Sequence, residues 1–411
     1  MKPYLQFIHA NRRFLGFGVA LTFFSSIGQT FFIAMFGDEL RAEFNLTDGG
    51  FGRLYMLATL ASGLTLMRVG RLIDCVDLRA WTAVIAAALA GAALCLAHAT
   101  TVVLLGLALF SLRLCGQGLM GHTAMTSMAR YYDRNRGIAL SIAGAGFAFG
   151  FAVFEELALR LRDVPWRQAW TYVAAAYAVV VVPFFVWLLR GQAERHRLHL
   201  ARLEAAERAP ATEHGSRRQW TRKEVVRDAR FWLALPAAVA TPFLMTGFIF
   251  HGIRLVEGKG WNLEWYSQCF VAFGVSTWVS SLVFGVLIDR VGARRLLPLF
   301  LIPLGVGLAV LATVRSPVGA LLYLSMAGIS AGATVITGAL WAELYGVAHL
   351  GAIRALSSAC MVFSTALSPW LMGELLDARV AMEAIAWMAL GYVILSSVLA
   401  GFVVRDRTEG A

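Results

Sequence analysis

The residues of this sequence best suited to chemistry are three charged side chains inside long apolar stretches. Arg113 stands midway through residues 102–125, and Glu155 and Glu156 stand near the end of residues 138–159. A charge at the centre of a bilayer costs roughly 2.5 to 3.5 kcal/mol on insertion scales. Each of these charged residues is therefore expected to have an ion-pair partner or a functional role. A guanidinium stays protonated and can hold a carboxylate through two hydrogen bonds. A carboxyl group in apolar surroundings holds a proton more readily than in water. These residue types indicate the binding of an organic anion together with proton transfer.

Arg113 admits two interpretations, which depend on what its helical face meets. Gln117 lies one turn further along on the same face, whereas His122 lies about 180° away by helical rotation. If the face meets a cavity, Arg113 and Gln117 bind substrate. If it meets other helices, Arg113 forms a structural ion pair or positions its own helix. His122 is a proton-coupling candidate on the opposite face.

The paired carboxylates cannot share one environment. Adjacent residues on a helix point about 100° apart. We expect either Glu155 or Glu156 to face inward as the proton-coupling residue. The alternative is that both lie at the outer membrane interface or pair with nearby Arg160.

Two stripes of uncharged polar residues extend the candidate site. One follows Thr22 in the first apolar stretch, and the other follows Ser330 in the tenth. Such stripes either line a cavity or join helices by hydrogen bonds. With them, the expected substrate-binding residues are Arg113, Gln117, Gln29, Ser26, Thr334, Thr337 and Trp341.

Motifs of enzymes and of nucleotide or metal binding are missing from the sequence. Gly144, Gly146 and Gly150 resemble a dinucleotide loop, but they belong to an apolar stretch without a preceding strand, which indicates close helix packing. No Walker loop, Ser-His-Asp order or metal cluster is present. The five cysteines form no close pair and are expected to be core residues. We therefore expect no enzymatic activity and no cofactor.

The apolar stretches that position these residues are long enough to cross a membrane. Hydrophobic residues make up 59% of the chain and charged residues 15%, too few to cover a soluble surface. About 20 residues of helix cross roughly 30 Å of hydrocarbon. Twelve such segments are predicted, at residues 14–36, 49–67, 80–99, 102–125, 138–159, 169–189, 231–252, 266–288, 296–313, 318–341, 353–373 and 382–403.

A long repeat divides these segments into two sets of six. The sequence Gly70-Arg71-Leu72-Ile73-Asp74 returns 215 residues later as Gly285-Val286-Leu287-Ile288-Asp289. Repeats of this length mark transporters built from two related halves, so we expect a substrate path between the halves. The predicted domains are a first bundle at residues 1–190, a basic linker at 191–230 and a second bundle at 231–411.

The charge distribution predicts the orientation of the chain. Lys and Arg collect on one side, which should be cytoplasmic: Lys2, Arg12, Arg13, Arg68, Arg71, Arg79, Arg130, Arg134, Arg136, Arg290, Arg294 and Arg295. Acidic residues collect on the other: Asp38, Glu39, Glu43, Asp48, Glu374, Asp377 and Glu383. The loop with Arg160, Arg162 and Arg167 is an exception. Both termini are then cytoplasmic. The net charge of +11 follows from this topology and from anionic lipid, without a nucleic-acid partner.

A motif at the repeat carries a resemblance to a known family. The second copy reads Gly285, Leu287, Asp289, Arg290, Gly292, Arg294 and Arg295; the first keeps Gly70, Leu72, Asp74 and Arg79 but has Cys75 and Asp77 in place of Arg and Gly. The pattern resembles the signature loop of the major facilitator superfamily, Gly-x-Leu-x-Asp-Arg-x-Gly-x-Arg-Arg. The resemblance implies an all-α membrane protein with twelve transmembrane helices in two pseudo-symmetric six-helix bundles. The glycines would allow close helix approach, and the aspartates would latch the halves at the cytoplasmic rim.

A second resemblance narrows the expected function. Gln117-Gly118-Leu119-Met120 and Arg136-Gly137-Ile138-Ala139 look like the monocarboxylate and oxalate/formate branch, although the eighth segment lacks that branch's charged pair. This implies a secondary active transporter of a small organic anion, with a monocarboxylate as the expected substrate and proton symport as a further expectation. We also expect the protein to be a monomer in a bacterial inner membrane. The alternatives are a drug or metabolite exporter and a non-transporting receptor on a transporter scaffold.

Overall fold

The computed structural model of the chain describes residues 2–74, 76–132, 136–197, 220–346 and 349–405. The side chains of residues 2–5, 71, 74, 136, 137, 289, 351, 352 and 405 also lie outside the description. Over the described residues every regular element is a helix. The predicted all-helical membrane protein is thereby confirmed.

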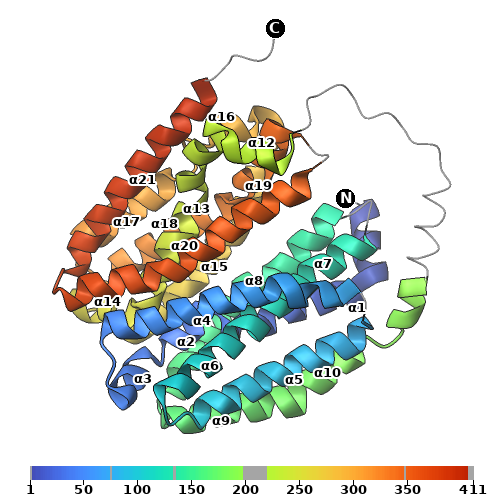
Figure 1. Cartoon of the computed structure of the whole chain (residues 1–411), viewed down its shortest axis with the longest axis horizontal. Helices are drawn as coiled ribbons and strands as arrows, with labels where there is room; N and C mark the ends of the chain where they lie inside the picture. The colour runs from blue at the N-terminus through green and yellow to red at the C-terminus, as the bar shows by residue number, and fades with distance from the viewer. Residues whose placement is uncertain (1, 75, 133–135, 198–219, 347–348, 406–411) are drawn as a thin grey trace. The chain divides into compact units, whose positions relative to one another are not determined.

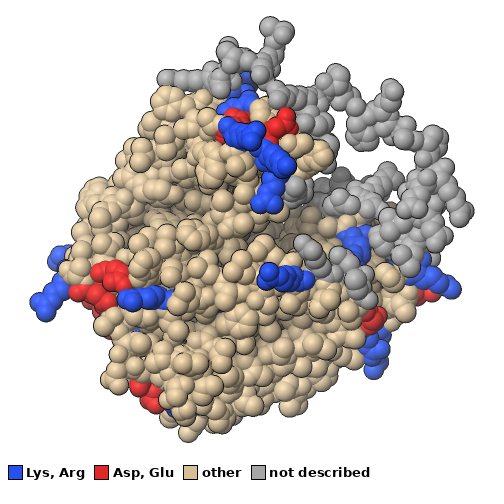
Figure 2. Space-filling model, in the orientation of Figure 1, with Lys and Arg blue, Asp and Glu red and all other residues tan. Residues whose placement is uncertain are grey.

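The membrane character is visible in helix length and in the surface. Ten helices of the described chain are long and apolar enough to span a membrane, and Ile302–Thr313 is a shorter apolar helix. Large apolar side chains such as Val84, Val103 and Val179 are more than 60% exposed, which suits a lipid environment. On the face drawn in Figure 2, charged side chains form a few separate groups with broad uncharged surface between them.

All twelve predicted segments coincide with helices. The second corresponds to α4 (Asp48–Val69), which is not among the ten. The ninth corresponds to α17 (Ile302–Thr313), which is shorter than predicted because residues 297–301 form turns.

The helices pack into two compact units (Figure 1). Each unit is continuous in the chain except at one place. Unit 1 contains Met1–Phe36 and Ala61–Gly215, and unit 2 contains Gly37–Leu60 and Ser216–Ala411. Residues 37–60 therefore follow the first helix of the chain but pack with the later helices. Since α4 runs from Asp48 to Val69, it begins in unit 2 and ends in unit 1.

Unit 1 is built around the pair α1 and α8 and around α5, which contacts α6, α9 and α10. Its elements are α1 (Lys2–Phe24), η1 (Ser25–Gly28), α2 (Thr30–Ala34), η2 (Gly70–Asp74), α5 (Leu78–Ala97), α6 (Val102–Leu112), η3 (Arg113–Met120), α7 (Gly121–Tyr131), α8 (Arg136–Leu161), α9 (Trp166–Ala176), η4 (Tyr177–Val181) and α10 (Val182–Leu188). A Cβ at Gly146 or Gly150 of α8 would overlap the hydroxyls of Thr22 and Ser26. The predicted role of these two glycines in helix packing is confirmed.

Unit 2 is built around two helix groups, in which α15 packs on α18 and α13 packs on α20 and α21. Its elements are α3 (Gly37–Phe44), α12 (Arg222–Arg227), α13 (Ala229–Phe250), α14 (Gly252–Lys259), α15 (Leu263–Val291), α16 (Ala293–Leu296), α17 (Ile302–Thr313), α18 (Val318–Ala333), α19 (Val335–Tyr345), α20 (Leu350–Asp377) and α21 (Met382–Arg405). The long helices α20 and α21, in orange and red, are prominent in Figure 1. Buried hydroxyls join the groups where Thr241 of α13 bonds Ser330 of α18 at 2.9 Å.

Candidate functional site

Arg113 lies at the start of a distorted helical segment in unit 1. The helix α6 continues without a break into η3, a π-helix of eight residues that begins at Arg113. Such π-helical turns are often found at functional sites. The side chain is 2% exposed. Its Nη1 donates hydrogen bonds to the Gly28 carbonyl oxygen at 3.4 Å and to Thr30 Oγ1 at 3.2 Å.

The partners of Arg113 come from a break in the first membrane segment. Between η1 and α2, Gln29 adopts an extended conformation with φ −83° and ψ 157°. A helix end leaves carbonyl groups without a partner inside the helix, and Gly28 is one residue before this break. The guanidinium therefore meets the backbone of another segment where that backbone can accept a hydrogen bond.

Two glycines allow this meeting. A Cβ on Gly116 would lie 2.7 Å from Gly28 Cα, and a Cβ on Gly28 would lie 2.8 Å from Gly116 Cα. Since real Cβ atoms do not approach so closely, the backbones of η1 and η3 can touch only without side chains at both positions. The contact fixes Arg113 beside the helix break.

The other predicted binding residues of unit 1 lie in different environments. Gln29, half-buried, sits between the two partners of Arg113 and donates from Nε2 to Ser25 Oγ at 3.3 Å. Ser26 is buried and donates to the Phe23 carbonyl oxygen at 2.6 Å. Gln117 is exposed although Arg113 is buried. Unit 1 thus brings Gln29 next to the partners of Arg113 and directs Ser26 toward the packing of α1 on α8.

The predicted stripe of unit 2 is largely satisfied within its own helices. Thr334 and Thr337 donate to carbonyl oxygens three residues earlier, at 2.6 and 2.8 Å. Trp341 is 2% exposed, and its ring lies 6.3 Å from that of Tyr345 and 5.1 Å from that of Phe231. The two threonine hydroxyls thus bond inside their own helical run, whereas Trp341 joins α19 to α13 through Phe231.

The three proton-coupling candidates lie in different environments, and the adjacent Glu155 and Glu156 point in different directions, as expected for neighbours on a helix. Glu155 is 2% exposed, and its Oε2 has no hydrogen-bond partner in the described part of the chain. Glu156 is partly exposed and pairs with Arg160 at 2.9 Å. His122 is exposed, with Nε2 at 3.2 Å from the Gly70 carbonyl oxygen. Glu155 is therefore the one candidate of the three that is enclosed by protein.

The second copy of the signature loop is held by a residue to which the sequence analysis gave no role. Gly292 ends α15 with φ +89°, a conformation that favours glycine. Glu343 Oε2 then accepts hydrogen bonds from the backbone nitrogens of Ala293 and Arg294, at 2.7 and 3.3 Å. Arg294 Nε donates to the Val403 carbonyl oxygen at 2.8 Å. A carboxylate that follows the tenth segment thus caps the loop.

The remaining motif residues differ in their surroundings. A Cβ at Gly285 would meet nothing within 4 Å, so the close helix approach expected there is not seen within unit 2. Arg290 is exposed. The side chain of Asp289 lies outside the described residues, as do the side chain of Asp74 and the whole of Cys75.

The first copy of the loop is held by different contacts. Asp77, which replaces the glycine, caps α5 by accepting from the backbone nitrogens of Arg79 and Ala80 at 3.0 Å. Arg79 Nε donates to the Val186 carbonyl oxygen at 3.1 Å. Arg130 of α7 donates to the Ile73 carbonyl oxygen at 3.1 Å. The departures from the family motif therefore have structural compensation.

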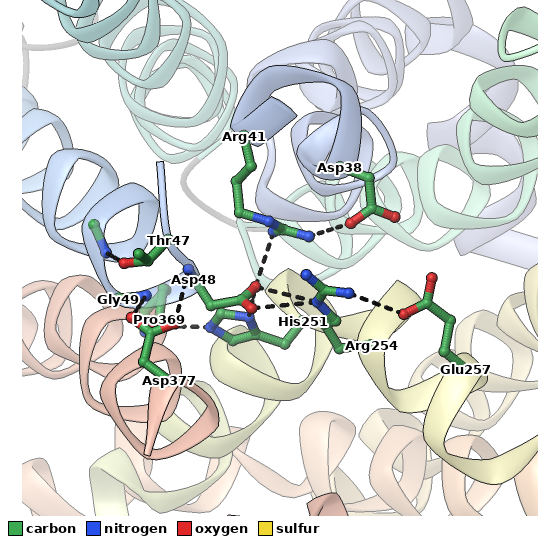
Figure 3. Close-up of polar contacts among 11 residues, drawn as sticks. Asp38, Arg41, Thr47, Asp48, Gly49, His251, Arg254, Glu257, Pro369 and Asp377 are labelled. Atoms are coloured by element: carbon green, nitrogen blue, oxygen red, sulfur yellow. Dashed lines mark hydrogen bonds and ion pairs between the residues drawn. The ribbon is translucent and has the colours of Figure 1, made fainter. Parts of the chain in front are cut away.

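A further charged centre lies in unit 2 and was missed by the sequence analysis (Figure 3). The Asp48 cluster comprises Arg41 of α3, Asp48 of α4, His251 and Arg254 next to α13, and Asp377 of α20. Asp48 Oδ1 lies 3.2 Å from Arg41 Nη1, and Oδ2 lies 3.2 Å from Arg254 Nε. His251 Nδ1 is 3.8 Å from Oδ1. The Asp377 carboxylate accepts from the backbone nitrogens of Asp48 and Gly49, at 3.1 and 2.9 Å.

Close backbone contact supports the Asp48 cluster. A Cβ on Gly52 would lie 2.6 Å from the Pro369 carbonyl oxygen, and a Cβ on Gly373 would lie 2.6 Å from that of Asp48. The absence of both side chains lets α4 and α20 approach closely. Phe250 packs on Phe51, with ring centroids 5.1 Å apart. Residues 37–60 are therefore fastened to the later helices of unit 2 by charge, by backbone contact and by aromatic packing.

His251 is the buried titratable group of this cluster. It is 1% exposed and follows the last residue of the membrane-spanning helix Ala229–Phe250. Its Nε2 lies 2.9 Å from the Pro369 carbonyl oxygen. Burial lowers the pKa of His251 to about 4, despite the opposing effects of the Pro369 hydrogen bond and the Asp48 charge. At neutral pH the imidazole is uncharged.

Comparison with known proteins gives the same fold. The Major Facilitator Superfamily matches residues 18–276. Two solved structures of a bacterial homologue of the human lysosomal transporter Spinster are similar, both at 14% identity. The inward-facing unoccupied form aligns over 97% of this chain and 99% of that chain, with a TM-score of 0.64. The inward-facing occupied form aligns over 100% of both, with a TM-score of 0.66. At this identity the likeness shows the fold alone. Comparison with curated protein sequences gave no match.

Proposed function

Since this chain belongs to the Major Facilitator Superfamily, we propose that it is a secondary active transporter of a small organic anion, working by alternating access. The observation that supports this proposal is the burial of Arg113 inside a membrane segment, beside the break in the first helix. A residue that stays charged in this position is costly. Binding of a substrate carboxylate would offset that cost.

The geometry of Arg113 suits a planar carboxylate. The hydrogen bonds from Nη1 to Gly28 and Thr30 orient the guanidinium plane before substrate arrives. A pre-oriented guanidinium loses less conformational entropy on binding. It can present two parallel donors to one carboxylate. Gln29, adjacent to both partners, is the second residue that we assign to the site.

A monocarboxylate is the substrate class that we propose, with proton symport. Support for the class comes from the loops that look like the monocarboxylate and oxalate/formate branch. Support for the proton comes from Glu155, whose carboxylate is enclosed by protein. The setting is a bacterial inner membrane, with both termini in the cytoplasm and the protein acting as a monomer.

A second candidate function is export of an apolar or amphipathic compound. It is supported by a cavity of about 820 Å³ in unit 2 between α13, α20 and α21, with apolar walls that include Phe243, Phe363 and Met372. Apolar pockets of this size accommodate drug-sized ligands. The absence of charged residues from its lining argues against carboxylate binding there.

Flux into proteoliposomes tests the proposal. Purified protein is reconstituted and offered a panel of radiolabelled monocarboxylates, dicarboxylates, cations and neutral drugs. Each compound is tested without a pH gradient, with a gradient that is acid outside, and with a gradient that is acid inside. We expect saturable monocarboxylate flux that an outside-acid gradient accelerates. Saturable flux of only cations or neutral drugs would reject the organic-anion proposal. Binding without flux would favour a receptor.

A further inference from the structure

The Asp48 cluster joins residues 37–60 to helices that come much later in the chain. Residues 37–60 come between the first and third membrane segments, yet they pack in unit 2. Asp48 contacts Arg254 and His251 after α13, and Asp377 at the end of α20 contacts the backbone of Asp48. In a transporter that alternates between two states, contacts between segments far apart in sequence are the natural place for a difference between those states.

We propose that the Asp48 cluster is a proton-binding latch: it fastens residues 37–60 to the later helices α13, α14 and α20 of unit 2 when His251 is neutral, and it opens when His251 binds a proton. The inference rests on the proposed function in one respect, namely that the protein alternates between two states. It does not depend on the identity of the substrate.

The hydrogen bonding of His251 shows where the proton binds. A carbonyl oxygen only accepts, so Nε2 carries the hydrogen in its contact with Pro369. In the neutral ring Nδ1 then has a lone pair, and it has no hydrogen-bond partner in the described part of the chain. The nearest carboxylate oxygen is Asp48 Oδ1 at 3.8 Å. A proton taken up by the closed latch would therefore sit on Nδ1.

Cations already surround the carboxylate that a protonated His251 would need. The charges that act on the ring are those of Asp48 of α4, Arg41 of α3 and Arg254 of α14. The partners of these groups carry further charge: Asp38 pairs with Arg41, Glu257 pairs with Arg254, and Asp377 of α20 accepts from the backbone of Asp48. Two guanidiniums lie 3.2 Å from the Asp48 carboxylate. Burial of the ring is the main reason why the closed latch disfavours an imidazolium, and the positive charges of Arg41 and Arg254 act in the same direction.

The sign of the pH effect follows from the two states. In the closed latch burial holds the pKa of His251 at about 4, whereas a solvent-exposed histidine has a pKa near 6.5. The open state therefore binds more protons between these values, and acid favours opening. From these two values, the open-to-closed ratio rises about tenfold between pH 8 and pH 5.5.

The position of the latch gives the direction of proton entry. Trp220, which belongs to the predicted linker, contacts Tyr345, the last residue of α19, and precedes α13. His251 follows the last residue of α13. The latch therefore lies at the end of α13 remote from the linker. In the proposed orientation this end faces outward, so His251 would take its proton from the outer solution. An acidic outer solution would then favour opening of the latch.

A distance measurement on the full chain tests the latch. The five native cysteines are replaced, and Ala42→Cys of α3 and Gly258→Cys of α14, both exposed, receive spin labels. Double electron–electron resonance is recorded in lipid nanodiscs without substrate between pH 8 and pH 5.5. We expect a longer-distance population whose ratio to the shorter one rises about tenfold. With His251→Gln, which keeps a donor for Pro369, the ratio should not change with pH. His98→Gln, at an exposed histidine, should respond like the parent protein.

Two results would overturn the inference. One is a parent protein whose distances do not change with pH, and the other is an unchanged pH response in His251→Gln. If His251→Gln does not fold, Asp48→Asn serves in its place, and it should raise the longer-distance population already at pH 8. Because no substrate is present, a failure of monocarboxylate flux leaves this test intact, and a failure of the latch leaves the flux proposal intact.

Discussion

Arg113 and Asp48 are both charged centres, but the chain builds them in opposite ways. Arg113 is buried within a membrane segment and bonds a backbone carbonyl and a hydroxyl from a nearby helix break. Asp48 stands at the end of a helix and is surrounded by charged side chains from segments far apart in sequence. The first arrangement holds a charge beside a helix break, where we propose that a ligand binds, whereas the second brings opposite charges together inside the protein.

This contrast indicates which centre should respond to substrate and which to conformation. In our proposal the Arg113 guanidinium binds the substrate carboxylate through charge-assisted hydrogen bonds. The negative charge of a carboxylate between two guanidiniums is compensated as long as the segments that carry them stay together. Substitutions at the two centres should therefore separate into losses of affinity and changes in stability or state.

The largest expected effect is at Arg113. Arg113→Ala should abolish monocarboxylate flux in an inserted, folded protein, because the charge that meets the substrate is lost. Arg113→Lys should weaken apparent affinity about tenfold or more, since one charge-assisted hydrogen bond contributes about 1.5 to 3 kcal/mol. Flux and thermal unfolding are measured on the same purified variants. Normal affinity in a stable Arg113→Ala protein would remove this residue from the binding site.

The adjacent carboxylates should differ strongly in proton dependence. Glu155→Gln removes the enclosed carboxylate and should eliminate the acceleration of flux by a pH gradient. Glu156→Gln is the matched control, because its exposed pair with Arg160 should contribute less than about 1 kcal/mol. Flux is recorded for both with and without the gradient. Equal gradient dependence in the two variants would contradict the assignment of Glu155.

Gly373→Ala should disturb the Asp48 centre without changing a charge. The added Cβ would lie 2.6 Å from the Asp48 carbonyl oxygen, and overpacking of this kind costs about 1 to 3 kcal/mol. We expect lower thermal stability and a larger open population in the spin-label experiment. Gly391→Ala, where a Cβ meets nothing within 4 Å, is the control and should be neutral or slightly stabilising. A Gly373→Ala protein as stable as the control would contradict the close approach of α4 and α20.

The smallest expected effect is at Asp377. Asp377→Ala removes the acceptor for the first backbone nitrogens of α4, and the loss of a helix cap costs about 0.5 to 2 kcal/mol. Thermal unfolding followed by circular dichroism should shift to lower temperature, while substrate affinity stays normal. Loss of affinity at unchanged stability would connect Asp377 to substrate binding and remove the distinction between the two centres.

The fold and Arg113 could be predicted because each leaves a local signal. Membrane segments appear as apolar runs, and a charge within such a run stands out. The Asp48 cluster gives no such signal. Its residues lie at the ends of segments, where charge is ordinary, and the sequence analysis used the acidic ones only for orientation. Their meeting depends on the packing of residues 37–60 in unit 2, which a division by chain order does not reveal.

Other details depend on backbone geometry that the sequence does not express. The position of Arg113 depends on the break at Gln29 and on the close contact of Gly28 with Gly116. Neither glycine is distinguishable by sequence from others in apolar runs. Glu343 could not be assigned from the sequence, because its partners are backbone nitrogens in the signature loop, which no side-chain pattern indicates.

The capping of α4 by Asp377 has a consequence for biogenesis. The first turn of α4 is synthesised more than 300 residues before the carboxylate that caps it, since Asp48 and Asp377 are 329 positions apart. While the later segments are still on the ribosome, the first amides of α4 must be satisfied by water or by lipid head groups. During this time Asp48 can pair with Arg41, but its second partner, Arg254, has not yet been synthesised. The second membrane segment is thus inserted early, but its first turn is secured only when the eleventh segment arrives, so α4 should be the last of the early segments to become resistant to proteolysis during synthesis.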